Sequence, residues 1–203
     1  MQVSEGDIGF AFQILTGLGI YSLTVIVGLS IMIFIVYPFL IRRFAEVKFK
    51  TFFKAISPAQ LLAFSTSSSA ATLPLTMERV EEELGVSKRV SSFVLPLGAT
   101  INMDGTALYQ GVAAVFIAQA VGMDLTLANQ FTIVATAVLA SIGTAGVPGV
   151  GLIMLGMVLN QVGLPLEGIA IVMGVDRFLD MLRTATNVSG DAMISFIIDK
   201  SEK

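Results

Sequence analysis

The chain has 203 residues, of which 55% are hydrophobic and only 13% are charged, and its net charge is −3. An ordinary soluble domain carries about 25% charged residues, so these values exclude that class and favour a membrane protein. There is no Cys and no His, which excludes disulfides, thiolate metal sites and imidazole catalysis. No Walker A, GxGxxG or HExxH pattern is present, so we expect no enzyme, no organic cofactor and no nucleic-acid partner.

Two uncharged windows, residues 8–41 and 125–166, each exceed the roughly 20 residues that cross a hydrocarbon core. The chain is therefore predicted to be a multi-pass protein of the cell (inner) membrane, in contact with the lipid bilayer. Residues 1–48 are predicted to form an N-terminal transmembrane helix, from about Thr16 to Ile41, and a basic flank. The bases that follow this helix are Arg42, Arg43, Lys48, Lys50 and Lys54. By the positive-inside rule this flank lies in the cytoplasm.

Residues 49–86 contain the uncharged run from Ala55 to Met77, with STSSSAATLP at its centre. Each half of this run has about eleven residues, too few to cross roughly 30 Å at about 1.5 Å per residue. The segment is predicted to be a re-entrant hairpin whose tip is the serine cluster. A plain serine-rich surface loop is the alternative.

Residues 87–124 are predicted to form a transmembrane helix that is broken at GATINMDGT. Residues 125–166 are interrupted halfway by SIGTAGVPGVG, where glycine and proline make a continuous helix improbable. Two half-spans that meet at an unwound tip fit better, so this segment is predicted to be a second re-entrant hairpin.

Residues 167–203 are predicted to form an amphipathic last transmembrane helix that ends in the cytoplasm. Its polar residues recur at steps of 4, 3, 4 and 4 and fall within a stripe less than about 90° wide; they are Asp176, Asp180, Arg183, Asn187 and Asp191. One interpretation is a structural ion network in which Asp176 and Asp180 pair with Arg177 and Arg183. The other is a binding site, because Asp180, Arg183, Thr184 and Asn187 supply the groups that an acidic amino acid needs.

Hard oxygen ligands are offered by Asn102, Asp104 and Asp191 and by carbonyls freed at the two broken backbones, residues 98–106 and 141–144. Such oxygens suit Na⁺, although kinks lined by water would also explain the breaks. At each hairpin tip, a helix that begins there directs free N–H groups and its positive dipole end toward an anionic ligand.

The chain also contains an internal repeat. When Pro74 is aligned with Pro148, Ser67 falls on Ser141 and Ala71 on Ala145, and Asn-x-x-Gly occurs in both TINMDG and TNVSGD. The predicted fold is an all-α polytopic membrane protein with two inverted repeats, each a re-entrant hairpin followed by a broken or polar transmembrane helix, as in secondary transporters.

Four motifs, STSSSAATLP, LPLGATINMDGTALYQG, ASIGTAGVPGVG and VDRFLDMLRTATNVSGD, together resemble the signatures of the dicarboxylate/amino acid:cation symporter family, which includes the excitatory amino acid transporters and archaeal aspartate homologues. The resemblance implies a single transport domain that moves, elevator fashion, against a trimeric scaffold. It implies symport of L-aspartate or L-glutamate with two or three Na⁺, and it makes the second hairpin the extracellular gate.

The resemblance also implies roles for individual residues. The substrate α-carboxylate is expected at Ser68, Ser69 and Asn187. The amino group is expected at Asp180 and the carbonyls of Ser67 and Val147, and the side-chain carboxylate at Arg183, Thr106 and the Gly151 amide. Met103, Asp176 and Thr184 complete the expected substrate site. The expected cation ligands are Gly98, Asn102, Asn187 and Asp191, then Thr100, Ser141, Ile142 and Thr144, and partly Asn102 with Asp104.

Three departures qualify the resemblance. The family chain is about twice as long, so this chain is expected to be its C-terminal half, without the scaffold that forms the homotrimer. Ser67 stands where archaeal aspartate transporters have arginine. Gln110 stands where eukaryotic members carry a glutamate linked to proton coupling, and this difference argues against proton and K⁺ countertransport. A C4-dicarboxylate symporter and a non-transporting membrane subunit remain as alternatives, and Na⁺ against H⁺ coupling and aspartate against glutamate stay open.

Overall fold

The computed structural model describes residues 5–45 and 47–202, with side chains from residue 14 onward. Residues 1–4, 46 and 203, which fall in the predicted segments 1–48 and 167–203, lie outside this description. Every regular element in the described part is a helix, so the prediction of an all-α protein is confirmed.

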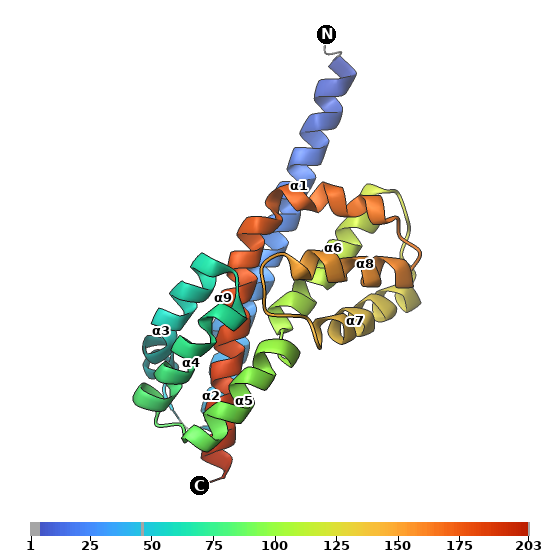
Figure 1. Ribbon diagram of the computed structural model, residues 1–203. Helices are drawn as coiled ribbons and strands as arrows, with labels where there is room; N and C mark the ends of the chain where they lie inside the picture. The colour runs from blue at the N-terminus through green and yellow to red at the C-terminus, as the bar shows by residue number, and fades with distance from the viewer. Residues whose placement is uncertain (1–4, 46, 203) are drawn as a thin grey trace.

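The first helix is long and apolar. It runs as α1 (Glu5–Ile31), a π-helical turn η1 (Met32–Val36) and α2 (Tyr37–Phe44) without an interruption between them. Among the described residues, Ile14–Phe44 is the one helix long and apolar enough to cross a membrane. Figure 1 shows α1 projecting beyond the rest of the molecule.

The first helical hairpin consists of α3 (Phe49–Thr66) and α4 (Ser69–Leu84). Helix α3 ends because Ser67 adopts a left-handed conformation with φ 53°. Helix α4 begins because the Ser68 side chain accepts a hydrogen bond from the Ala71 amide, which satisfies one of the free N–H groups of the first turn. The serine cluster therefore forms both caps of this turn.

The remaining helices are interrupted at the Gly- and Asn-containing motifs. Helix α5 (Lys88–Ile101) and helix α6 (Asp104–Ala120) are separated by two non-helical residues, Asn102 and Met103. The second hairpin consists of α7 (Leu127–Ser141) and α8 (Val150–Gln161), joined by residues 142–149. A short 3₁₀ turn, η2 (Leu166–Gly168), leads into α9 (Ile169–Ser201).

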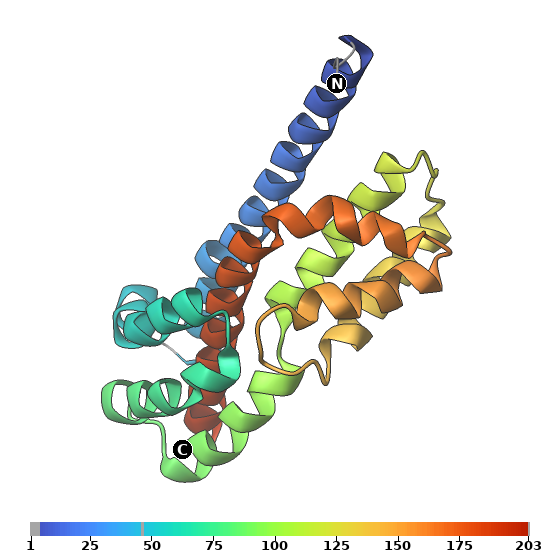
Figure 2. The ribbon, with the colours of Figure 1, turned by 45° about the horizontal axis from the view of Figure 1, so that its top comes forward.

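Helix α9 occupies the centre of the molecule and contacts α1, α3, α4, α5 and α6. Figures 1 and 2 show the α3–α4 hairpin on one side of it and the α7–α8 hairpin on the other. One apolar cluster joins α1, α6, α7 and α8 to the start of α9. A second cluster joins α2, α3, α4 and α5 to the end of α9. The polar residues 180–191 of α9 lie between the two clusters, so the fold holds the polar stripe at the middle of the molecule.

Candidate functional site

Both hairpin tips, the break between α5 and α6 and the polar face of α9 surround one small cavity. Nine of the predicted substrate residues line it: Ser67, Ser69, Met103, Thr106, Val147, Gly151, Asp180, Thr184 and Asn187. Its volume is about 20 Å³, room for one water molecule and far below the roughly 300 Å³ of a typical ligand pocket. The walls must therefore separate before an amino acid can enter.

The two hairpin tips touch each other directly. The Ser68 hydroxyl donates to the Gly146 carbonyl at 2.8 Å, and the Ala70 amide donates to the same oxygen at 3.1 Å. Ser68 is thus a cap and a bridge between the hairpins instead of a cavity-lining residue. The Ser67 hydroxyl lies in the cavity wall, is buried and has no hydrogen-bond partner among the described residues, so it is available to a ligand.

Arg183 is the most deeply buried charge of the site, with 1% of its surface exposed. Its Nη1 atom lies 2.8 Å from Asp176 Oδ1 and its Nη2 atom 2.9 Å from Asp180 Oδ1. The guanidinium carbon lies 3.7 Å from the centre of the Tyr109 ring. Asp176 and Asp180 therefore both pair with Arg183, as in the ion-network interpretation, whereas Arg177 is exposed.

Asp180 and Asn187 of α9 also contact the start of α8 and the start of α6. Asp180 accepts a hydrogen bond from the Gly149 amide at 3.0 Å, at the start of α8. A Cβ at Gly151 would lie 3.1 Å from Arg183 Nη2, a tight contact that glycine avoids where α8 meets the guanidinium. Asn187 accepts from the Gly105 amide at 2.9 Å and donates to Thr106 at 3.0 Å, which fixes the orientation of its side-chain amide.

The predicted cation residues Gly98, Asn102 and Asp191 lie together on the other side of the α5–α6 break. Asn102 donates its side-chain amide to Asp191 at 3.0 Å, and its backbone N–H donates to the Gly98 carbonyl at 2.8 Å. Asp191 is 4% exposed, and no basic side chain of the described residues forms an ion pair with it. A buried carboxylate without a cation is costly, so this arrangement fits Na⁺.

The donor chemistry of the cation residues also favours a monovalent hard ion. Within the described residues no group of three or more carboxylate, imidazole or thiolate side chains could hold a metal ion. A cation here would be held by amide, carbonyl and hydroxyl oxygens together with a single carboxylate such as Asp191. This ligand set matches the unwound-backbone sites of secondary transporters.

The second predicted cation set lies where the α7–α8 loop meets the end of α5. The α7–α8 loop joins the end of α5, because the Gly143 amide donates to the Thr100 carbonyl at 2.7 Å. The side chains of Thr100 and Ile142 are exposed, and the hydroxyls of Ser141 and Thr144 donate within their own segment, to Val138 and Ala140.

Four features of the site have no counterpart in the predicted set. They are the Tyr109 ring under Arg183, the Gly146 carbonyl between the tips, the Tyr37 hydroxyl on Asp104 and the hydrogen bond from Gln60 to Ser189. Tyr37 and Gln60 lie on helices outside the predicted motifs. Tyr109 lies within one of these motifs, and Gly146 lies in the predicted second tip. Each contact is tertiary, so no spacing or composition could have identified it.

Comparison with known proteins defines the class. The model of the sodium:dicarboxylate symporter family matches residues 4–201. The chain belongs to this family, whose members are transporters, so the prediction that it is not an enzyme is confirmed.

Several similar proteins are excitatory amino acid transporters. The chain is 50% identical over 182 residues to excitatory amino acid transporter 1 of Ambystoma tigrinum, and this alignment covers 90% of this chain and 34% of that protein. It is 50% identical over 194 residues to excitatory amino acid transporter 3 of Mus musculus, covering 95% and 37%, and 48% identical over 182 residues to transporter 4 of Rattus norvegicus, covering 90% and 32%. The chain thus spans about a third of the length of these relatives.

Proposed function

We propose that this chain forms the substrate- and cation-binding part of a multi-pass Na⁺-coupled symporter for L-aspartate or L-glutamate. The observation that carries the proposal is the buried Arg183, which pairs with Asp176 and with Asp180, and Asp180 lines the cavity between the two hairpin tips. The three relatives described above are excitatory amino acid transporters, and their names support the same substrate class.

The charges of the cluster favour an amino acid over a plain dicarboxylate. Two aspartates and one arginine leave one surplus negative charge. An incoming side-chain carboxylate can replace an aspartate on the planar guanidinium fork, which binds carboxylates through two parallel hydrogen bonds. The substrate ammonium can then pair with the released Asp180. Succinate or malate has no ammonium, and either would add two negative charges to a site that is already negative.

The same charge count favours coupling to cations. An acidic amino acid carries a net negative charge into a region that already contains Asp104 and Asp191 in addition to the Arg183 cluster. In a low-dielectric interior that accumulation is strongly unfavourable. Na⁺ held by Gly98, Asn102, Asn187 and Asp191 would offset it, so substrate and cation are expected to stabilise each other's binding.

The hairpins are proposed to act as re-entrant walls and the α7–α8 hairpin as the extracellular gate. The cavity is too small for an amino acid while Gly146 bonds to Ser68 and Ala70. Opening requires these two hydrogen bonds and the contact between Gly149 and Asp180 to break. We further propose that this chain moves across the membrane, in an elevator mechanism, against a trimeric scaffold.

The test is substrate binding by Arg183→Ala, with Arg177→Ala as the matched control, since Arg177 is exposed on the same helix. We expect the first variant to bind L-aspartate at least roughly 30-fold more weakly in saturating NaCl, because truncating one partner of a buried charged contact costs about 2 kcal/mol or more. The ratio of aspartate to serine affinity is the readout, because partial loss of folded protein does not change it.

Two results would contradict the proposal. One is an aspartate-to-serine ratio that stays the same in Arg183→Ala. The other is binding of aspartate by the unaltered protein that is equal in NaCl and in choline chloride. Competition by succinate as strong as competition by L-glutamate would favour the dicarboxylate alternative instead.

A further inference from the structure

Tyr37 places a hydroxyl beside the predicted cation ligands Asn102, Asp104 and Asp191, which we call the cation region. It does so from a helix that otherwise packs through apolar side chains. Its side chain is 1% exposed. The hydroxyl donates to Asp104 Oδ2, and it also lies 3.3 Å from the Thr186 carbonyl. The other Asp104 oxygen accepts the Gly105 amide at 2.9 Å. Tyr37 therefore completes a donor pair that holds the Asp104 carboxylate in one orientation.

The π-helical turn explains how Tyr37 reaches this position. Buried residues on the first helix recur every four positions, at Tyr21, Val25 and Leu29 before the turn and at Tyr37, Ile41 and Ala45 after it. In an ideal α-helix each step of four turns about 40° beyond a full rotation, so the face would drift away from α9. In η1 the Tyr37 amide bonds to the Met32 carbonyl, five residues back, and the wider turn absorbs that drift. Such turns often occur at functional sites.

The Tyr37 hydroxyl and the Asn102 side chain both lie close to Gly190, and these residues connect the carboxylates of Asp104 and Asp191. A Cβ at Gly190 would lie 3.0 Å from the Tyr37 hydroxyl, 3.1 Å from Asn102 Nδ2 and 3.5 Å from Asp104 Oδ1. Asn102 in turn donates to Asp191. Glycine at position 190 thus lets α2, the α5–α6 break and α9 converge, where Tyr37 is the side-chain donor to Asp104 and Asn102 the side-chain donor to Asp191.

We propose that Tyr37 is a positioning residue for Na⁺ binding, which holds Asp104 and through it the α5–α6 break in the geometry that accepts the cation. The inference rests on the proposed Na⁺-coupled function. Partners that orient a ligand without touching the metal commonly change metal affinity by about 10- to 100-fold. Tyr37 would do so from outside the motifs that contain the cation ligands.

The test uses Tyr37→Phe, which keeps the buried ring and removes only the hydroxyl. Tyr21→Phe is the matched control, since the Tyr21 side chain is 2% exposed on the same long helix and its hydroxyl has no hydrogen-bond partner among the described residues. The readout is the NaCl concentration that gives half of the maximal rise in Tm of the purified protein, without amino acid. We expect this concentration to rise about tenfold or more in Tyr37→Phe and to stay the same in Tyr21→Phe.

A double variant separates positioning from general loss of stability. If Tyr37 acts through Asp104, Tyr37→Phe will not raise the half-saturating NaCl concentration further in an Asp104→Ala background, which has no side-chain acceptor for the hydroxyl. The inference is overturned if Tyr37→Phe lowers Tm without Na⁺ but leaves the NaCl midpoint within twofold of the unaltered protein. If the unaltered protein shows no rise in Tm with NaCl, the proposed Na⁺ function fails and the inference falls with it.

Discussion

The Asp191 carboxylate lies against the backbone of α5, where a Cβ at Gly98 would be 2.7 Å from its Oδ1 atom. The carboxylate cannot easily move away, because it is 4% exposed and the same oxygen accepts the Asn102 amide. We therefore expect Gly98→Ala to displace Asp191 and raise the half-saturating Na⁺ concentration about tenfold. Crowding of this kind also costs about 1–3 kcal/mol of folding stability, measurable as a lower Tm.

Gly174→Ala is the control for this substitution. Gly174 lies within α9, and a Cβ there meets nothing within 4 Å. Alanine in a helix interior is favoured over glycine by about 0.5–1 kcal/mol, so this variant should keep its Na⁺ response with an unchanged or higher Tm. Equal Na⁺ midpoints in the two variants would show that Gly98 has no special role.

The spacing of residues along the chain identifies which side chains meet but not how they pair. The polar stripe of α9 is evident from steps of three and four, and nine predicted substrate residues do line one cavity. Spacing alone could not show that Arg183 binds both aspartates, because that depends on rotamers and on the Tyr109 ring supplied by α6. Nor could it identify Tyr37, whose direction is set by the π-helical turn.

At the element scale, the contact between the hairpins depends on Gly146. A Cβ there would lie 3.0 Å from the Ala70 nitrogen and 3.1 Å from the Ala99 carbonyl oxygen. Both atoms belong to the backbone of helices, so neither can shift alone. We expect Gly146→Ala to separate the tips and to increase hydrogen exchange of the Ala70 amide, which donates to the Gly146 carbonyl.

Gly111→Ala provides the comparison for the hairpin contact. Gly111 lies in α6, away from both tips, and a Cβ there has no neighbour within 4 Å. The Ala70 amide should exchange as slowly in this variant as in the unaltered protein. If Gly146→Ala left its exchange equally slow, the tips would not be held together by this carbonyl.

The helix interruptions follow from local chemistry and are therefore visible in the sequence. Ser67 and Ser68 form the two caps of the first turn, and the breaks at residues 102–103 and 142–149 fall in the segments rich in glycine, asparagine and proline. The meeting of the two tips at one carbonyl is a tertiary contact between residues 78 positions apart. Periodicity within one segment carries no information about it.

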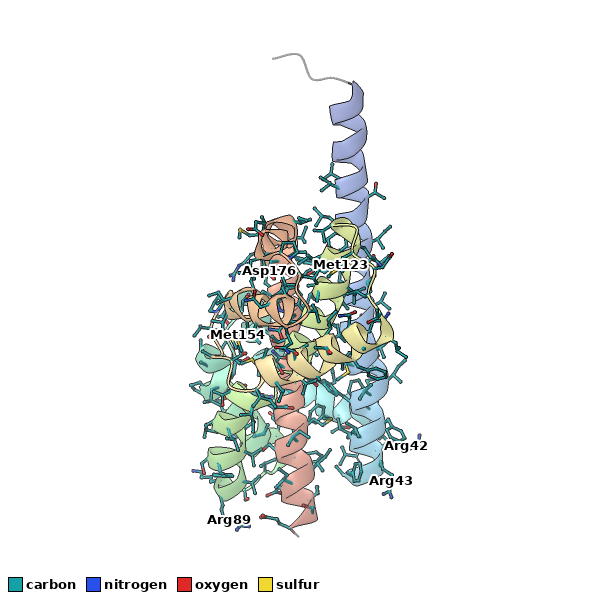
Figure 3. The ribbon with its side chains drawn as sticks, turned by 90° about the vertical axis from the view of Figure 1, so that its right-hand side faces the viewer. Arg42, Arg43, Arg89, Met123, Met154 and Asp176 are labelled. Atoms are coloured by element: carbon teal, nitrogen blue, oxygen red, sulfur yellow. The ribbon has the colours of Figure 1, made fainter. Side chains whose placement is uncertain are left out.

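At the scale of the whole molecule, basic residues gather at one end. Figure 3 places Arg42, Arg43 and Arg89 at the end of the molecule where α9 finishes, while Met123 and Asp176 lie toward the other end. Lys48, Lys50 and Lys54 are exposed and follow Arg43 at the start of the first hairpin. Basic loops are retained in the cytoplasm, so this end is expected to face inward and the loop at Asp124 outward.

That orientation can be tested with single cysteines, because the chain has none of its own. Asp124 and Lys54 are both exposed, so substitution at either should leave the fold intact. In intact cells, Asp124→Cys is expected to react with a membrane-impermeant maleimide, and Lys54→Cys only after permeabilisation. The reverse labelling pattern would mean that the chain has the opposite orientation in the membrane. The α3–α4 hairpin, instead of α7–α8, would then be the one that opens to the outside. Equal labelling of both positions before permeabilisation would place them on the same side and contradict the inverted arrangement of the two hairpins.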